Sequence, residues 1–243
     1  MKKLKRHLYL IAKSLFSKSN EHFSPHGIPI FIPTSVDLAI RYLLAKGRPY
    51  EEPEADMVKS YLAPNTNVIE LGGCLGIISA LIRKQIGPHA KHIIVEANPN
   101  LAAICLLNAK QDSDVGATEV VVAAIDYSGA DSVQFSVGNN AHVGHVSHLN
   151  EEGLTAPTVT LSKLAQRIPE GPFALVCDIE GAEVRLFEEE RDMLSRLSLV
   201  VLETHSDVYS DGKATQNEML KQIKTAGLEE IARSEAVICF RRI

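Results

Sequence analysis

The sequence predicts an α/β fold in which a mostly parallel sheet is covered by helices. From Asn65 onward, short apolar runs alternate with segments of helical periodicity, the pattern of a parallel sheet with helical crossovers. The last two apolar runs are separated by a short turn only, which predicts an antiparallel pair at the end of the chain. In such sheets ligands bind beyond the carboxyl ends of the strands.

Five strands are expected before the terminal pair, at 67–71, 91–97, 118–125, 173–179 and 197–205. Helices are expected from the glycine cluster to Ile86, from Asn98 to Lys110, over 161–168, from Ala182 to Leu197 and over 215–226. Asn98-Pro99 supplies an N-cap and a first helical position. An inserted β element is predicted at 131–137, and the terminal pair at 228–233 and 236–242.

The chain of 243 residues suits one domain, predicted at 50–243, behind a basic amphipathic segment and lead-in at 1–49. The net charge of −5 argues against nucleic acid as the partner. The four cysteines form no CxxC pair, so a zinc knuckle is not expected, and a reducing cytoplasm is the predicted location.

Residues 1–20 carry six Lys or Arg and no acid. Leu4, Leu8, Ile11 and Leu15 fall on one stripe of a helix, which can lie on an anionic membrane surface. Packing on the chain's own domain, or on a partner subunit of a homodimer, is an equal alternative.

A glycine cluster, Glu70-x-Gly72-x-x-x-Gly76, follows the first core strand. Glycines there let the backbone approach a ligand, although such turns also serve packing. Glu96 ends the second strand, 20 residues past Gly76, where a carboxylate can take both hydroxyls of a ribose. The spacing is not GxGxxG, and no Lys or Arg between Glu70 and Ile82 would assist a pyrophosphate.

The expected cleft is acidic, because Glu70, Glu96, Asp178 and Glu180 all fall at the carboxyl ends of strands. Such a cleft repels the phosphates of a dinucleotide and suits a ligand with a sulfonium and an ammonium. S-adenosylmethionine carries both, together with a ribose for Glu96. A Rossmann-like shell without any nucleotide is the remaining alternative.

Three segments carry a family resemblance: "VIELGGCLGIISALI", "HIIVEANPN" and, most specifically, "LVCDIEGAE". The last is similar to the Lys-Ile-Asp-x-Glu-Gly-x-Glu signature of FkbM-type methyltransferases, a class I group dependent on S-adenosylmethionine. The resemblance covers roughly residues 50–205. Two positions depart from the usual pattern: Cys177, where a Lys is commoner, and Glu70, where Asp is common.

The resemblance implies a seven-stranded Rossmann-like methyltransferase fold with helices on both faces of the sheet. It also implies methyl transfer, most often to a hydroxyl of a sugar, glycan or secondary metabolite, while some members methylate nitrogen. An NAD-linked oxidoreductase or epimerase, and a cofactor-binding module without catalysis, are the alternatives. The expected cofactor-binding residues are Glu70, Gly72, Gly73, Gly76, Glu96, Ala97, Ala124 and Asp178.

A sugar hydroxyl is a poor nucleophile, so a base near its proton is expected. Asp178 is the first candidate, and holding the ammonium of the cofactor is its alternative role. Glu180 and His205 are the further catalytic candidates. Glu183 lies in a first helical turn, where the helix dipole stabilises a carboxylate, and is predicted to be structural.

"NNAHVGHVSHLN" places His142, His145 and His148 at intervals of three. The Gly and Asn residues around them favour a loop over a metal-binding helix, and no metal is predicted. This loop is expected to lie over the cleft, with His142, His145 and Tyr50 contacting the acceptor. Glu51 and Glu54 are interpreted as ordinary acids at a helix N-terminus.

Overall fold

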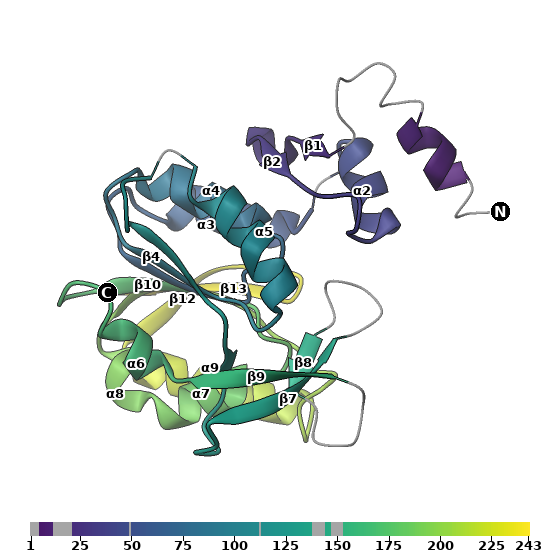
Figure 1. Ribbon diagram of the computed structural model, residues 1–243. Coiled ribbons are helices and arrows are strands. Elements are labelled where there is room, and N and C mark those ends of the chain that lie inside the picture. Colours follow the sequence, from purple (N-terminus) through teal and green to yellow (C-terminus); the bar gives the residue numbers. More distant parts are fainter. Residues whose placement is uncertain (1–4, 12–20, 49, 112, 138–143, 147–152) are drawn as a thin grey trace.

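A computed structural model describes residues 5–11, 21–48, 50–111, 113–137, 144–146 and 153–243 (Figure 1). Its centre is a seven-stranded sheet in the order β12-β13-β11-β10-β3-β4-β5. β13 runs antiparallel to both of its neighbours, and the β11-β10-β3-β4-β5 pairs are parallel. The strands are β3 (Val68–Leu71), β4 (His92–Val95), β5 (Thr118–Val121), β10 (Phe173–Cys177), β11 (Leu197–Glu203), β12 (Leu228–Ser234) and β13 (Val237–Arg242).

Helices cover both faces of this sheet, as Figure 1 shows. One face carries α3 (Glu52–Tyr61), α4 (Ile77–Ile86) and α5 (Pro99–Ala109). The other carries α6 (Leu161–Ala165), α7 (Glu183–Glu189), α8 (Arg191–Leu194) and α9 (Lys213–Thr225). The predicted α/β fold is therefore confirmed.

The central strand β10 is apolar throughout because it is buried on both sides. Ala174 and Val176 belong to the core under α3 and α4. Phe173, Leu175 and Cys177 belong to the opposite core, with side chains of α6 to α9. Alternate side chains thus anchor opposite helical layers, and the carboxyl end of β10 is held rigidly.

The strand predicted at 118–125 is divided. β5 stays in the main sheet, whereas β6 (Ala124–Ile125) pairs with β9 (Gly153–Val159) in a second sheet of order β6-β9-β7-β8. The inserted β element is confirmed as β7 (Ser132–Val137), which also pairs with β8 (Gly144–Val146). β9 was not predicted, since it contains Pro157, and proline argues against a strand interior.

The helix predicted from Ala182 to Leu197 is broken at Glu190, between α7 and α8. The Glu190 side chain is buried and accepts hydrogen bonds from the Tyr127 hydroxyl at 3.2 Å and the Ser162 amide at 3.0 Å. These contacts pull Glu190 inward, and its backbone leaves the helical conformation.

Residues 5–11 are helical, as predicted. Leu10 makes the contact with the core, and Tyr9 packs edge-on against Tyr42 of α2 (Leu38–Ala45) at 5.4 Å. Leu8 and Ile11, on the predicted stripe, are 57% and 51% exposed. Leu4 and Leu15 lie outside the described residues, and contact with a membrane or a partner subunit stays a prediction.

The lead-in from 21 to 45 adds β1 (His22–Phe23), η1 (Pro25–Gly27) and β2 (Ile30–Phe31). Asn108 of α5 fixes β2 in place, because its side chain exchanges two hydrogen bonds with the Phe31 backbone at 2.8 and 2.9 Å. None of the helices in the described ranges has the length and hydropathy needed to cross a bilayer.

Candidate active site

The glycine loop after β3 is shaped by close contacts within the protein. Gly72 has φ +94, and a Cβ there would lie 1.8 Å from the carbonyl oxygen of Asp178. A Cβ on Gly73 would lie 2.5 Å from Ile94, and one on Gly76, φ +74, 2.8 Å from the Cys105 backbone. The amides of Gly72 and Gly73 both donate to the Val95 carbonyl. The loop thus packs tightly against β4, α5 and the end of β10, and only glycine fits.

Glu70 is buried and both of its carboxylate oxygens are occupied by protein. Oε1 accepts a hydrogen bond from the Ser79 hydroxyl at 2.8 Å, and Oε2 lies 2.7 Å from His92 Nε2. His92 is fully buried. Glu70 therefore ties β3, which precedes the glycine loop, to α4 and β4, which follow it.

Glu96 follows β4 and joins two loops. Its oxygens accept hydrogen bonds from the Cys74 amide and the Asn98 amide, each at 2.7 Å. Burial raises the pKa of Glu96, although both amide donors oppose the rise. Each oxygen of a carboxylate retains accepting capacity after one hydrogen bond, so Glu96 can still receive hydroxyl groups.

A small hollow lies between the glycine loop, the start of α3 and the end of β10. Among the described residues, its lining includes Tyr50 and the acids Glu51, Glu54, Glu70 and Asp178, and no basic residue. Burial and the charge of Asp178 raise the pKa of Glu51 to about 8, while a hydrogen bond from Tyr50 opposes the rise. Burial, then the charge of Glu51, raises the pKa of Glu54 well above its usual range.

Burial, and after it the neighbouring acids, thus favour the protonated forms of Glu51 and Glu54 in the free protein, because further negative charge in the hollow is unfavourable. A ligand with positive charge would relieve the repulsion, whereas a phosphate would increase it. The residues present therefore fit the sulfonium and the ammonium of S-adenosylmethionine.

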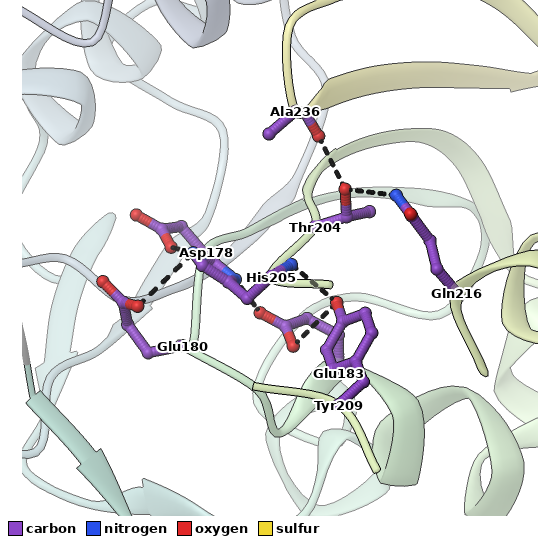
Figure 2. Close-up of polar contacts among 8 residues, drawn as sticks. All are labelled: Asp178, Glu180, Glu183, Thr204, His205, Tyr209, Gln216 and Ala236. Atoms are coloured by element: carbon purple, nitrogen blue, oxygen red, sulfur yellow. Dashed lines mark hydrogen bonds and ion pairs between the residues drawn. The ribbon is translucent and has the colours of Figure 1, made fainter. Parts of the chain in front are cut away.

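Beside the hollow, four side chains form a carboxylate–histidine cluster: Asp178, Glu180, Glu183 and His205 (Figure 2). His205 follows β11, and its Nδ1 donates to Glu183 Oε1 at 2.7 Å. Its Nε2 lies 3.3 Å from Asp178 Oδ1 and 3.5 Å from Glu180 Oε2. Glu180 takes part from a left-handed backbone conformation, φ 52, just before Gly181.

The cluster shifts the pKa of both Asp178 and His205. Burial, followed by the charge of Glu203, raises the pKa of Asp178 to about 7, although His205 lowers it. Burial alone would lower the pKa of His205, but Glu183, Asp178 and Glu180 outweigh burial and raise it to about 9. An imidazolium between carboxylates accounts for these contacts, and the prediction of no metal stays a prediction.

The other predicted residues are placed as follows. Ala97 and Ala124 pack together in a small apolar cluster with Ala156. His145 lies in β8, where it pairs with Ser136 of β7. His142 and His148 lie outside the described residues.

Sequence reasoning did not assign three members of the site to it. Tyr209 lies beyond the fifth strand, yet its hydroxyl donates to Glu183 Oε2 at 3.3 Å and accepts from the His205 amide at 2.9 Å. Glu203 is the last residue of β11 and could have been selected as a strand-terminal acid. Glu54, interpreted as an ordinary acid at a helix N-terminus, is buried.

Known structures resemble this fold at low sequence identity. A TehB-like methyltransferase from Corynebacterium glutamicum is 15% identical, with 84% of this chain and 95% of that chain covered and a TM-score of 0.44. Aeropyrum pernix fibrillarin, solved with natively bound S-adenosylmethionine, is 14% identical over 76% and 72%, with a TM-score of 0.42. The N-methyltransferase NodS from Bradyrhizobium japonicum is 10% identical over 78% and 92%, with a TM-score of 0.41.

No functionally curated protein matches the sequence. The profile of the methyltransferase FkbM domain, however, matches residues 71–229. The matched range spans most of the chain and contains the glycine loop, Glu96 and the whole carboxylate–histidine cluster. The chain therefore belongs to the FkbM family of S-adenosylmethionine-dependent methyltransferases.

Proposed function

We propose that this methyltransferase methylates a hydroxyl oxygen of a small acceptor such as a sugar, a glycan or a secondary metabolite. The observation that carries the proposal is the position of Asp178. This residue lines the acidic hollow and also faces His205 in the carboxylate–histidine cluster. Asp178 therefore belongs both to the hollow proposed to hold the cofactor and to the carboxylate–histidine cluster beside it.

Asp178 is suited to accept a proton near neutral pH. A base works best when its pKa lies close to the working pH, and the pKa of Asp178 is raised to about 7. Bound S-adenosylmethionine supplies an electrophilic methyl group. Asp178 would accept the proton that the acceptor hydroxyl loses when its oxygen takes the methyl group.

The other residues have binding roles in this proposal. Glu96 receives the ribose hydroxyls, and Glu51 and Glu54 compensate the positive charge of the cofactor. Tyr50, which is buried and hydrogen-bonded to Glu51, holds that carboxylate in place. The glycine loop sets the distance between these groups and Asp178.

The test is a binding measurement followed by product analysis. Calorimetry with S-adenosylmethionine and its demethylated product should show binding to the full chain. Methyl transfer from labelled cofactor is then assayed against a panel of sugars, glycosides and amines, and the methylated atom is located by NMR. Asp178→Asn should lose about 10²–10⁴-fold in kcat and keep cofactor affinity.

Asp192→Asn is the matched control, because Asp192 is an exposed acid on α8. Methyl groups found only on nitrogen, or full activity of Asp178→Asn, would refute the proposal. Cofactor binding without transfer to any compound would instead indicate a binding module without catalysis.

A further inference from the structure

Glu183 is completely buried at the first residue of α7, and the His205 ring lies between it and the carboxylates of Asp178 and Glu180 (Figure 2). We propose that Glu183 is a positioning residue that keeps His205 in its protonated form, so that the imidazolium holds Asp178 ionised and ready to accept a proton. The proposal rests on the proposed function, in which Asp178 is the base.

The contacts of Glu183 fix both the ring and the backbone of His205. One oxygen accepts a hydrogen bond from His205 Nδ1 at 2.7 Å, and the other accepts one from the Tyr209 hydroxyl at 3.3 Å. Tyr209 in turn accepts the backbone N–H of His205 at 2.9 Å. With Nδ1 committed to Glu183, the atom presented to Asp178 is Nε2, at 3.3 Å.

Charge balance also requires a cation at this place. A carboxylate with no exposure is costly to ionise unless a positive group pairs with it. His205 is the group that meets Glu183, and its Nε2 side faces Asp178 and Glu180 as well. A protonated ring satisfies three carboxylates, whereas a neutral ring would leave the charges of these acids uncompensated by His205.

The groups around Asp178 act in opposite directions. Glu203 at the end of β11, Glu180 in the turn after β10 and Glu183 on α7 raise its pKa. Glu51 and Glu54 of the α3 start, Tyr50 beside them and Glu70 of β3 share the hollow with it. His205 lowers the pKa of Asp178, and this effect is larger than the rise that Glu183 causes.

The sign of the effect follows from that order. The two largest contributions that raise the pKa of His205 both come from Glu183. In Glu183→Gln the ring should therefore lose its proton at a lower pH, and Asp178 should lose its neighbouring cation. Loss of that cation outweighs the direct loss of the Glu183 charge, so Asp178 should be protonated up to a higher pH.

The experiment has two arms, both on the full chain. In the first, NMR follows the ring proton of His205 from about pH 5.5 to pH 10, with His205→Asn to assign the signal. The wild-type midpoint is expected at about 9. In Glu183→Gln it should fall by more than one pH unit. A wild-type midpoint below about 7 would overturn the proposal, whether or not Glu183→Gln folds.

In the second arm, kcat for methyl transfer is measured against pH. The acidic limb of the pH profile of kcat should move to higher pH in Glu183→Gln. At a fixed pH on that limb, kcat should then be about ten-fold lower for each pH unit of movement. KM for the cofactor should change little, and Glu183→Asp should restore part of the rate. Glu188→Gln, an exposed acid on the same helix, should leave the limb in place.

A downward shift of the limb would mean that neutral His205 is itself the base, and would overturn the proposal while leaving the methyl transfer reaction intact. Failure to methylate any acceptor would count against the proposed function only. The titration of His205 would still decide whether Glu183 keeps the ring protonated.

Discussion

Gly72→Ala should push the glycine loop away from Asp178, the proposed base. The new Cβ would lie 1.8 Å from the Asp178 carbonyl oxygen, whereas ordinary van der Waals contact begins at 3.4 Å. One of the two segments must then move by about 1.6 Å. The Asp178 amide donates a hydrogen bond to the Leu71 carbonyl at 2.9 Å. This bond links the end of β10 to the end of β3, so neither segment moves freely.

The cost has two parts that can be separated. The positive φ of Gly72 costs an alanine about 1–2 kcal/mol. Overpacking against a fixed backbone adds about 1–3 kcal/mol. We therefore expect Gly72→Ala to lower the free energy of unfolding by about 2–5 kcal/mol, measured by urea denaturation, and to weaken cofactor binding measured by calorimetry.

Gly116→Ala is the control for the backbone term. Gly116 has a similar φ of +77, but an added Cβ would have no atom of the described residues within 4 Å. It should lose about 1–2 kcal/mol and bind cofactor normally. Equal losses of stability in the two variants, or unchanged cofactor affinity in Gly72→Ala, would refute the steric argument.

Three further outcomes are expected. Ser79→Ala leaves the buried Glu70 Oε1 without its donor and should cost about 1–3 kcal/mol in urea unfolding; a change near zero would contradict that role. Phe187→Ala opens a cavity at a fully buried side chain and should cost about 3–5 kcal/mol, checked by the same denaturation. The free energy of unfolding of the free protein should fall as pH rises from about 4 to 9, because Asp178 and His205 both bind protons more tightly when folded. For Asp178 the stabilisation is complete below its unfolded pKa of 3.8 and is lost through about 7, and for His205 it is complete below 6.5 and is lost through about 9. A constant free energy of unfolding over the first range would contradict the shift of Asp178, and over the second range the shift of His205.

The parts of the fold that depend on local pattern were predictable. Continuous apolar runs marked β3, β4, β10 and β11, because these strands are buried on both faces. Since parallel strands end at one edge of a sheet, the same runs were sufficient to predict that Glu96 and Asp178 lie at the same edge. β9 was missed because its pairing with β6 and β7 depends on partners far along the chain, and Pro157 suggested a loop.

The role of Glu183 could not be predicted for a similar reason. Its position in a first helical turn is explained by the helix dipole alone, and its partner His205 is 22 residues away. The two meet because β10 and β11 are adjacent parallel strands, so the segments that follow them emerge side by side. Burial then changes an ordinary helix-starting acid into an ion-pair partner.

Glu96 shows how preorganisation is built into this site. Its carboxylate is fixed by two backbone amides, one from the glycine loop and one from the start of α5. The conformational entropy of that side chain is therefore lost when the chain folds, and a ribose that binds there does not have to order it. If Glu96 binds the ribose as proposed, affinity for the nucleoside half of the cofactor should depend on the integrity of two loops, and a substitution that loosens either loop should weaken binding without touching the ligand.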